Sequence, residues 1–130
     1  MLMIKKMLFT CLFLLTAFVM MAQNNNTPQK LLRHVVLFSF KAESTTQQIK
    51  NVTDAFAALP QQIPQIKTFE WGTNNSPENL NQGFTHCFFV GFANETDRAI
   101  YLPHPAHKAF SETLKPILDK VLVLDYWSGK

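Results

Sequence analysis

The sequence has 130 residues, with 12 basic and 9 acidic side chains and a formal net charge of +3. This length suits one domain and excludes two independent hydrophobic cores. Because no basic run or basic stripe interleaved with aromatic residues is present, we expect no nucleic-acid partner.

The N-terminal segment has the pattern of a secretory signal peptide. Lys5 and Lys6 precede an apolar run over residues 7–21, and Ala22 comes before a polar stretch. The run is shorter than the roughly 20 residues that a bilayer-spanning helix needs, so an uncleaved anchor is the second interpretation. The predicted organisation has three parts: a signal peptide over residues 1–22, a polar lead-in over residues 23–30 and a domain over residues 31–128. We therefore expect a secreted or periplasmic protein with no stable membrane association after cleavage.

Cleavage after Ala22 would leave one cysteine, Cys87. A single thiol cannot form an internal disulfide, so the exported domain is not a disulfide scaffold. Cys87 lies in an apolar run without an adjacent base, and we expect it to be a small buried hydrophobic residue and not a nucleophile.

The first half of the domain predicts a strand, a helix and two further strands. β-Branched and aromatic residues predict a strand over residues 31–41. A capping-box pattern over residues 44–47 then begins a helix, which Pro60 ends. Residues 66–72 and residues 84–93 predict the second and third strands, separated by a long polar turn.

The second half predicts a helical region divided by prolines, and then a last strand. A short helix begins at Asn94 and ends near Leu102. Pro105 suits the first turn of another helix, and Pro116 ends it. Residues 121–127 predict the final strand, which completes the order β-α-β-β-α-β.

This order predicts an α+β fold, namely a ferredoxin-like β-α-β-β-α-β antiparallel sheet with helices on one face. The first, third and last strands are apolar on both faces: Val35 and Leu37 alternate with Val36 and Phe38 in the first strand. Because the helices cover only one face, a second copy of the sheet is the simplest cover for the other. We therefore predict a homodimer, built as a dimeric α/β barrel.

The segment Tyr101-Leu-Pro-His-Pro-Ala-His107 places a phenol and two imidazoles in a joint shaped by two prolines. These side chains can move protons near neutral pH. Four further segments accompany it in the same order along the chain: residues 34–41, 69–72, 83–90 and 124–126. With these segments the chain resembles the Dabb family, the stress-responsive A/B barrel domain, over nearly all of residues 31–127.

The resemblance implies a dimeric α/β barrel and suggests a chemistry. The best-understood enzymes of this kind are plant polyketide cyclases of the olivetolic acid type, which promote an intramolecular aldol condensation without a metal or organic cofactor. Carried over by motif, His107 is the catalytic base, Tyr101 is the catalytic hydrogen-bond donor, and His34 lines the same cavity. The predicted export departs from this picture, because such cyclases work beside a cytosolic synthase.

The candidate ligand-binding residues are His34, Tyr101, His104, His107 and Trp71. Structural roles stay open beside them: His107 could cap a kinked joint, and His104 could satisfy backbone groups of the turn. His104 and His107 are three residues apart, but a zinc site needs further ligands and none has a suitable spacing, so we predict no metal site. The 12 phenylalanines suit an apolar pocket as well as a core and a dimer seam.

Three hypotheses follow. The first is an exported homodimer that binds a small apolar or aromatic molecule in a barrel cavity, with a stress-related role. The second is a cofactor-free acid–base enzyme with polyketide cyclase-like or lyase and isomerase chemistry, and the sequence leaves catalysis open. The third is a structural dimerisation module without a ligand.

Overall fold

The computed structural model describes residues 30–129 of the chain. The predicted signal peptide and residues 23–29 of the predicted lead-in lie outside this range. Within it, no helix combines the length and the hydropathy that crossing a membrane requires.

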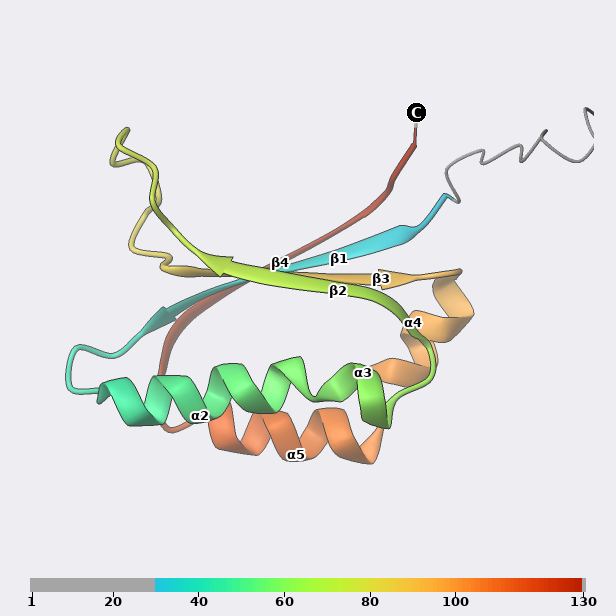
Figure 1. Cartoon of the computed structure of the whole chain (residues 1–130), viewed down its shortest axis with the longest axis horizontal. Helices are drawn as coiled ribbons and strands as arrows, with labels where there is room; N and C mark the ends of the chain where they lie inside the picture. The colour runs from blue at the N-terminus through green and yellow to red at the C-terminus, as the bar shows by residue number, and fades with distance from the viewer. Residues whose placement is uncertain (1–29, 130) are drawn as a thin grey trace, which may run out of the picture.

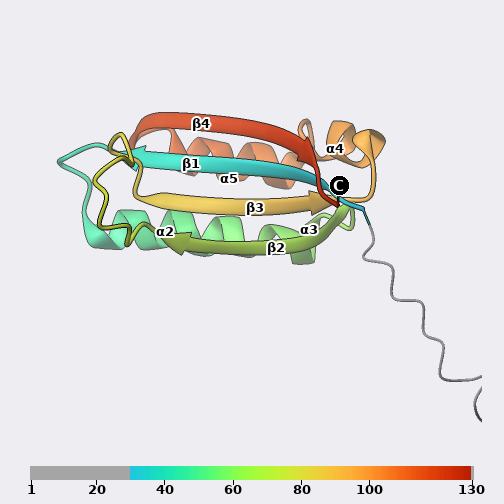
Figure 2. The same cartoon turned by 90° about the horizontal axis from the view of Figure 1, so that it is seen from above.

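The described residues form a four-stranded antiparallel sheet with helices against one face (Figure 1). The elements along the chain are β1 (Leu32–Phe40), α2 (Thr46–Ala57), α3 (Leu59–Gln62), β2 (Ile66–Thr73), β3 (His86–Phe92), α4 (Glu95–Tyr101), α5 (Pro105–Leu114) and β4 (Leu118–Trp127). The order of strands across the sheet is β2-β3-β1-β4, as Figure 2 shows from above. The ferredoxin-like α+β fold predicted from the sequence is confirmed.

Several boundaries differ from the predicted ones for local reasons. The capping box begins one residue later than predicted, since Thr45 is the N-cap of α2 and exchanges hydrogen bonds with Gln48. Pro60 does not end the helix: α2 ends at Ala57, and Pro60 lies in the first turn of α3. A proline fits there because the first turn needs no N–H from it.

The strand boundaries also shift slightly. The third strand begins at His86, because the preceding turn carries Gln82 and Gly83 at positive φ before the chain enters the sheet. The last strand begins at Leu118, three residues earlier than predicted. Asn94 caps α4 through its side chain, and Pro105 occupies the first turn of α5, as predicted.

The hydrophobic core lies between the sheet and the helices α2 and α5. Phe56 of α2 is at its centre, with ring centroids 4.5 Å from Phe88 of β3 and 4.5 Å from Phe110 of α5. Phe38 of β1 completes this group at 5.2 Å from Phe88. All four side chains are buried, so aromatic contacts join the sheet to both long helices.

The other face of the sheet has no helix over it (Figure 1). Leu37 of β1 and Phe89 of β3 lie on this open face, and both are only partly buried. Leu124 and Tyr126 of β4 are 59% and 48% exposed there. The open face is therefore an apolar surface, as the two-sided apolar pattern of the strands predicted.

Candidate functional site

A cavity of about 340 Å³ lies between the helix-facing side of the sheet and α5. Most of its lining is apolar, and its polar side chains include His34, Tyr101 and His107. Val121 and Val123 of β4 also line the cavity but are 50% and 47% exposed, because α5 does not reach over this edge strand. The cavity thus opens to solvent along β4, and its volume suits a small organic molecule.

Tyr101 ends α4 and is fully buried. Its hydroxyl is the one buried side-chain polar atom among residues 30–129 that has no hydrogen-bond partner. Burial raises the pKa of the Tyr101 phenol above its usual range, so the group stays protonated at neutral pH. Tyr101 lines the cavity and therefore carries a hydrogen-bond donor without a protein partner. A buried donor without a partner costs about 1–3 kcal/mol.

His107 lies in the first turn of α5, with its ring centroid 4.3 Å from that of Tyr101. Its Nδ1 donates a hydrogen bond to the carbonyl oxygen of Leu102 at 2.9 Å. In the neutral ring, Nε2 is therefore the nitrogen with the free lone pair. Burial lowers the pKa of His107, with smaller contributions from the nearby His34 and His104, and these outweigh the opposing effect of the Leu102 hydrogen bond. His107 is a neutral acceptor next to a phenolic donor.

His34 reaches the same cavity from β1 and is 6% exposed. Its ring lies edge-on to Tyr101, with centroids 5.9 Å apart. Three of the residues that the sequence predicted for a site, His34, Tyr101 and His107, are therefore brought together on one cavity wall.

The other two predicted ligand-binding residues are not in this cavity. His104 is the N-cap of α5, where its Nδ1 accepts the backbone N–H of Ala106 at 3.1 Å, so its ring serves the helix start. Trp71 is on β2, the edge strand opposite β4, and stacks on His86 with centroids 6.2 Å apart. Both residues therefore lie outside the cavity that His34, Tyr101 and His107 line, and Trp71 lines a separate hollow.

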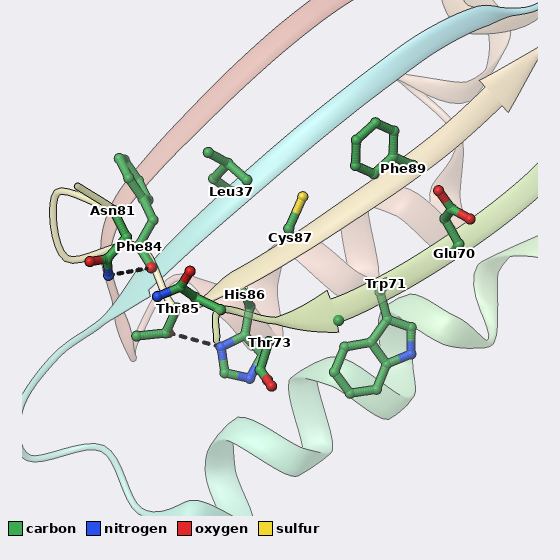
Figure 3. A pocket seen from close by; sticks show the side chains of 12 residues that line it. Leu37, Glu70, Trp71, Thr73, Asn81, Phe84, Thr85, His86, Cys87 and Phe89 are labelled. Carbon is green, nitrogen blue, oxygen red and sulfur yellow. Dashed lines mark hydrogen bonds between the residues drawn. The ribbon is translucent and has the colours of Figure 1, made fainter. Parts of the chain in front are cut away.

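A second hollow, of about 410 Å³, lies at the end of the sheet near the β2–β3 turn (Figure 3). Leu37, Cys87 and Phe89 line it from the open face, while Trp71 and His86 lie on the helix side. Cys87 is half-buried on the open face and not within the helix-covered core, which corrects the prediction of a buried residue. Burial and then the charge of Glu70 raise the pKa of the Cys87 thiol, which opposes a nucleophilic role.

The structure also places two residues at the site that the sequence reasoning did not assign to it. Asp125 of β4 accepts a hydrogen bond from His34 Nδ1 at 2.9 Å, and Arg98 of α4 lies 3.3 Å from the other carboxylate oxygen. Their roles depend on the register of β1 against β4, which no local pattern indicates. Among residues 30–129 no group of three or more His, Cys, Asp or Glu side chains is placed to hold a metal ion.

Comparison with protein families gives a match over almost the whole described domain. The family model for the stress responsive A/B barrel domain, Dabb, matches residues 32–128. The stress-response A/B barrel domain-containing protein HS1 of Arabidopsis thaliana is 42% identical over 94 residues, which cover 72% of this chain and 86% of HS1. Olivetolic acid cyclase of Cannabis sativa is 30% identical over 98 residues, or 75% of this chain and 97% of the cyclase.

Solved structures show the same fold. A hydroxynitrile lyase from Passiflora edulis superimposes with a TM-score of 0.73 at 27% identity, covering 79% of this chain and 97% of the lyase. A protein of unknown function from Bacteroides fragilis, described as dimeric and ferredoxin-like, has a TM-score of 0.61 at 26% identity over 74% of this chain and 94% of its own.

Proposed function

Because the chain belongs to the Dabb family of stress responsive A/B barrel domains, we propose that it binds a small apolar or aromatic molecule in the cavity between the sheet and α5. The ligand carries an oxygen that accepts a hydrogen bond. The protein acts as an exported homodimer with a stress-related role. The proposed export rests on the sequence pattern of a leader over residues 1–22. These residues lie outside the part of the chain that the structure describes.

The observation that carries this proposal is the buried Tyr101 hydroxyl without a partner on the wall of an open, largely apolar cavity. A ligand acceptor would satisfy this donor, and the apolar lining would gain from contact with a hydrocarbon or ring. The His107 ring lies beside the phenol, and its neutral Nε2 has a free lone pair. This nitrogen can accept a hydrogen bond from a second polar group of the ligand.

Two observations support the homodimer. The open face of the sheet is apolar, and Leu37, Cys87 and Phe89, which line the hollow of Figure 3, lie on it. The Bacteroides fragilis structure, which has the same fold, is described as dimeric. A second copy of the sheet would remove Leu124 and Tyr126 from water. Burial of exposed apolar surface of this kind favours association.

We expect the Tyr101→Phe variant to bind 4-hydroxybenzaldehyde about tenfold more weakly than the wild-type protein, since the variant loses the donor to the aldehyde oxygen. Isothermal titration calorimetry measures the change. Tyr126→Phe is the matched control, because it removes the other tyrosine hydroxyl of the chain from a half-exposed position on the open face. Equal affinities of the two variants would contradict the proposed role of Tyr101.

A second candidate function is cofactor-free acid–base chemistry on a carbonyl compound. The pairing of the His107 acceptor with the Tyr101 donor favours it, as does the likeness to a cyclase and a hydroxynitrile lyase. In an aldol reaction His107 Nε2 would remove a proton alpha to one carbonyl, while the Tyr101 hydroxyl donates to the enolate oxygen. The carbanion carbon would bond to a second carbonyl carbon, whose oxygen would then take the proton from the imidazolium.

The likeness to the lyase gives a direct assay. Cleavage of benzaldehyde cyanohydrin needs a base to take the hydroxyl proton as the bond to cyanide breaks and benzaldehyde forms; the protonated base then returns the proton to cyanide. We expect His107→Gln to lower the rate of benzaldehyde release about 100-fold. We expect 4-hydroxybenzaldehyde affinity to stay within a few fold, because the glutamine amide oxygen can still accept a hydrogen bond from the ligand. The wild-type rate should fall as the pH decreases through the lowered pKa of His107, because the imidazolium cannot accept a proton. An equal rate in the His107→Gln variant would exclude this residue as the base.

A further inference from the structure

Outside the cavity, Asp125 contacts the His34 ring, and Arg98 contacts Asp125 in turn. Asp125 is directly opposite His34 in the β1–β4 ladder, and its Oδ1 is 2.9 Å from His34 Nδ1. Arg98 Nη1 lies 3.3 Å from Asp125 Oδ2. The side chains of Asp125 and Arg98 are 32% and 27% exposed, so the His34 ring is the buried member of the group.

This arrangement determines which nitrogen of His34 carries the proton. A carboxylate only accepts hydrogen bonds, so Nδ1 of His34 must donate to Asp125. In the neutral ring, Nε2 then has the free lone pair, and within residues 30–129 it makes no hydrogen bond to the protein. His34 lines the cavity, so its remaining nitrogen is the one available to a ligand.

We propose that Asp125 is a positioning residue, which holds His34 in the Nδ1–H tautomer and thereby presents Nε2 as a hydrogen-bond acceptor to the cavity. Arg98 lies beside the second oxygen of the carboxylate and holds the group in place. This inference rests on the proposed function for the identity of the ligand, and it narrows the ligand class. A molecule that suits the site has an acceptor oxygen for the Tyr101 hydroxyl and a hydroxyl donor for the histidines, as in an aromatic hydroxy-carbonyl compound.

The helix α4 supplies residues on both sides of the His34 ring. Arg98 and Tyr101 are three residues apart on α4, so one element supplies the arginine behind His34 and the phenol in front of it. The groups that face the His34 ring are thus Asp125 from β4 and Tyr101 from α4, with Arg98 behind the carboxylate. His107 approaches from α5, and the nearby His34 contributes to the lowered pKa of His107. The two neighbouring imidazoles, His34 and His107, therefore differ in their hydrogen-bond partners, because only His34 has a charged one.

The tautomer can be measured without any ligand. We would record ¹⁵N-edited NMR spectra of the histidine side chains over a pH series, assign His34 by the signals lost in His34→Gln, and compare the tautomers in the neutral form of the ring. In the wild-type protein we expect a protonated Nδ1 and an unprotonated Nε2. In Asp125→Asn we expect the Nε2–H form to become a major species, since an amide can donate to Nδ1 where a carboxylate cannot.

Asp119→Asn is the matched control. Asp119 is on the same strand and also accepts a hydrogen bond from β1, from Ser39 Oγ at 3.0 Å, but it is not next to His34. We expect its His34 signals to equal those of the wild-type protein. An unchanged tautomer in Asp125→Asn, or an Nε2–H form in the wild-type protein, would overturn the assignment of Asp125.

Calorimetry with 4-hydroxybenzaldehyde separates this inference from the proposed function. We expect Asp125→Asn to weaken binding about tenfold and Asp119→Asn to leave it unchanged. If the tautomer changes as expected but the wild-type protein does not bind the probe, the positioning role of Asp125 stands and the proposed ligand class is wrong. If the wild-type protein binds and Asp125→Asn binds equally well despite a changed tautomer, Nε2 of His34 is not a ligand contact and that part of the proposal fails.

Discussion

The Phe56→Ala variant is expected to lower the free energy of unfolding by about 3–5 kcal/mol, the usual cost of removing a fully buried phenylalanine ring. Phe56 of α2 is 1% exposed, and its ring contacts both the sheet and the other long helix, α5. Its ring is 4.5 Å from the rings of Phe88 in β3 and Phe110 in α5. The sheet and helices cannot close the space without moving apart from their other contacts, so most of the void would persist. Urea unfolding followed by circular dichroism measures the loss.

Phe84→Ala provides the comparison for this prediction. Phe84 lies in the β2–β3 turn, is only partly buried and has Lys120 Nζ over its ring at 5.2 Å. The same chemical change should therefore cost about 1 kcal/mol or less, because water can replace the lost ring. Losses of the same size in both variants would contradict the central place of Phe56 in the core.

The Phe89→Glu variant is expected to be a monomer at concentrations where the wild-type protein is a dimer, with a dimer dissociation constant raised several hundred-fold or more. Phe89 is in the inner strand β3 on the open face, between Val35 on β1 and Glu70 on β2. A partner sheet would bury the new carboxylate without a compensating charge, and the two-fold axis would do so twice. An uncompensated buried charge costs about 3–5 kcal/mol, which corresponds to a factor of roughly 100 to 4,000 in affinity.

Size-exclusion chromatography with light scattering over a dilution series tests this prediction. Leu80→Glu adds the same charge at an apolar residue that is 69% exposed in the β2–β3 turn, and it should leave the dimer intact. Circular dichroism should show the native fold in both variants, since Phe89 is only partly buried in the single chain. A wild-type monomer at micromolar concentration, or a Phe89→Glu dimer of unchanged affinity, would contradict the proposed interface.

The sequence predicts the elements well where the signal is local. The side chain of Asn94 caps α4, and Pro105 begins α5, because a cap or a first-turn proline acts within a few residues. Pro60 misleads for the same reason: a proline just after a helix and a proline in the first turn of the next one have the same local pattern. The apolar residues on both faces of β1 correctly predict that the open face of the sheet is apolar.

The site is only partly predictable for a different reason. Tyr101 and His107 are six residues apart, and the prolines between them hold their rings on one cavity wall. His104 has the same residue type in the same segment, but its ring caps the helix, which depends on the backbone direction and not on the residue order. Asp125 is 91 residues from His34, and a shift of one residue in the β1–β4 register would place it on the opposite face.

The central position of β1 determines the order in which the sheet can be completed. β1 comes first among the described strands, yet both of its neighbours, β3 and β4, come from later in the chain. Its ladder with β4 pairs Leu32 with Trp127, and contacts between such distant residues close long loops and slow folding. A nascent chain that has not yet emerged through Leu118–Trp127 leaves one side of β1 with unpaired backbone groups. The strand that is synthesised first is therefore the last to be paired on both sides.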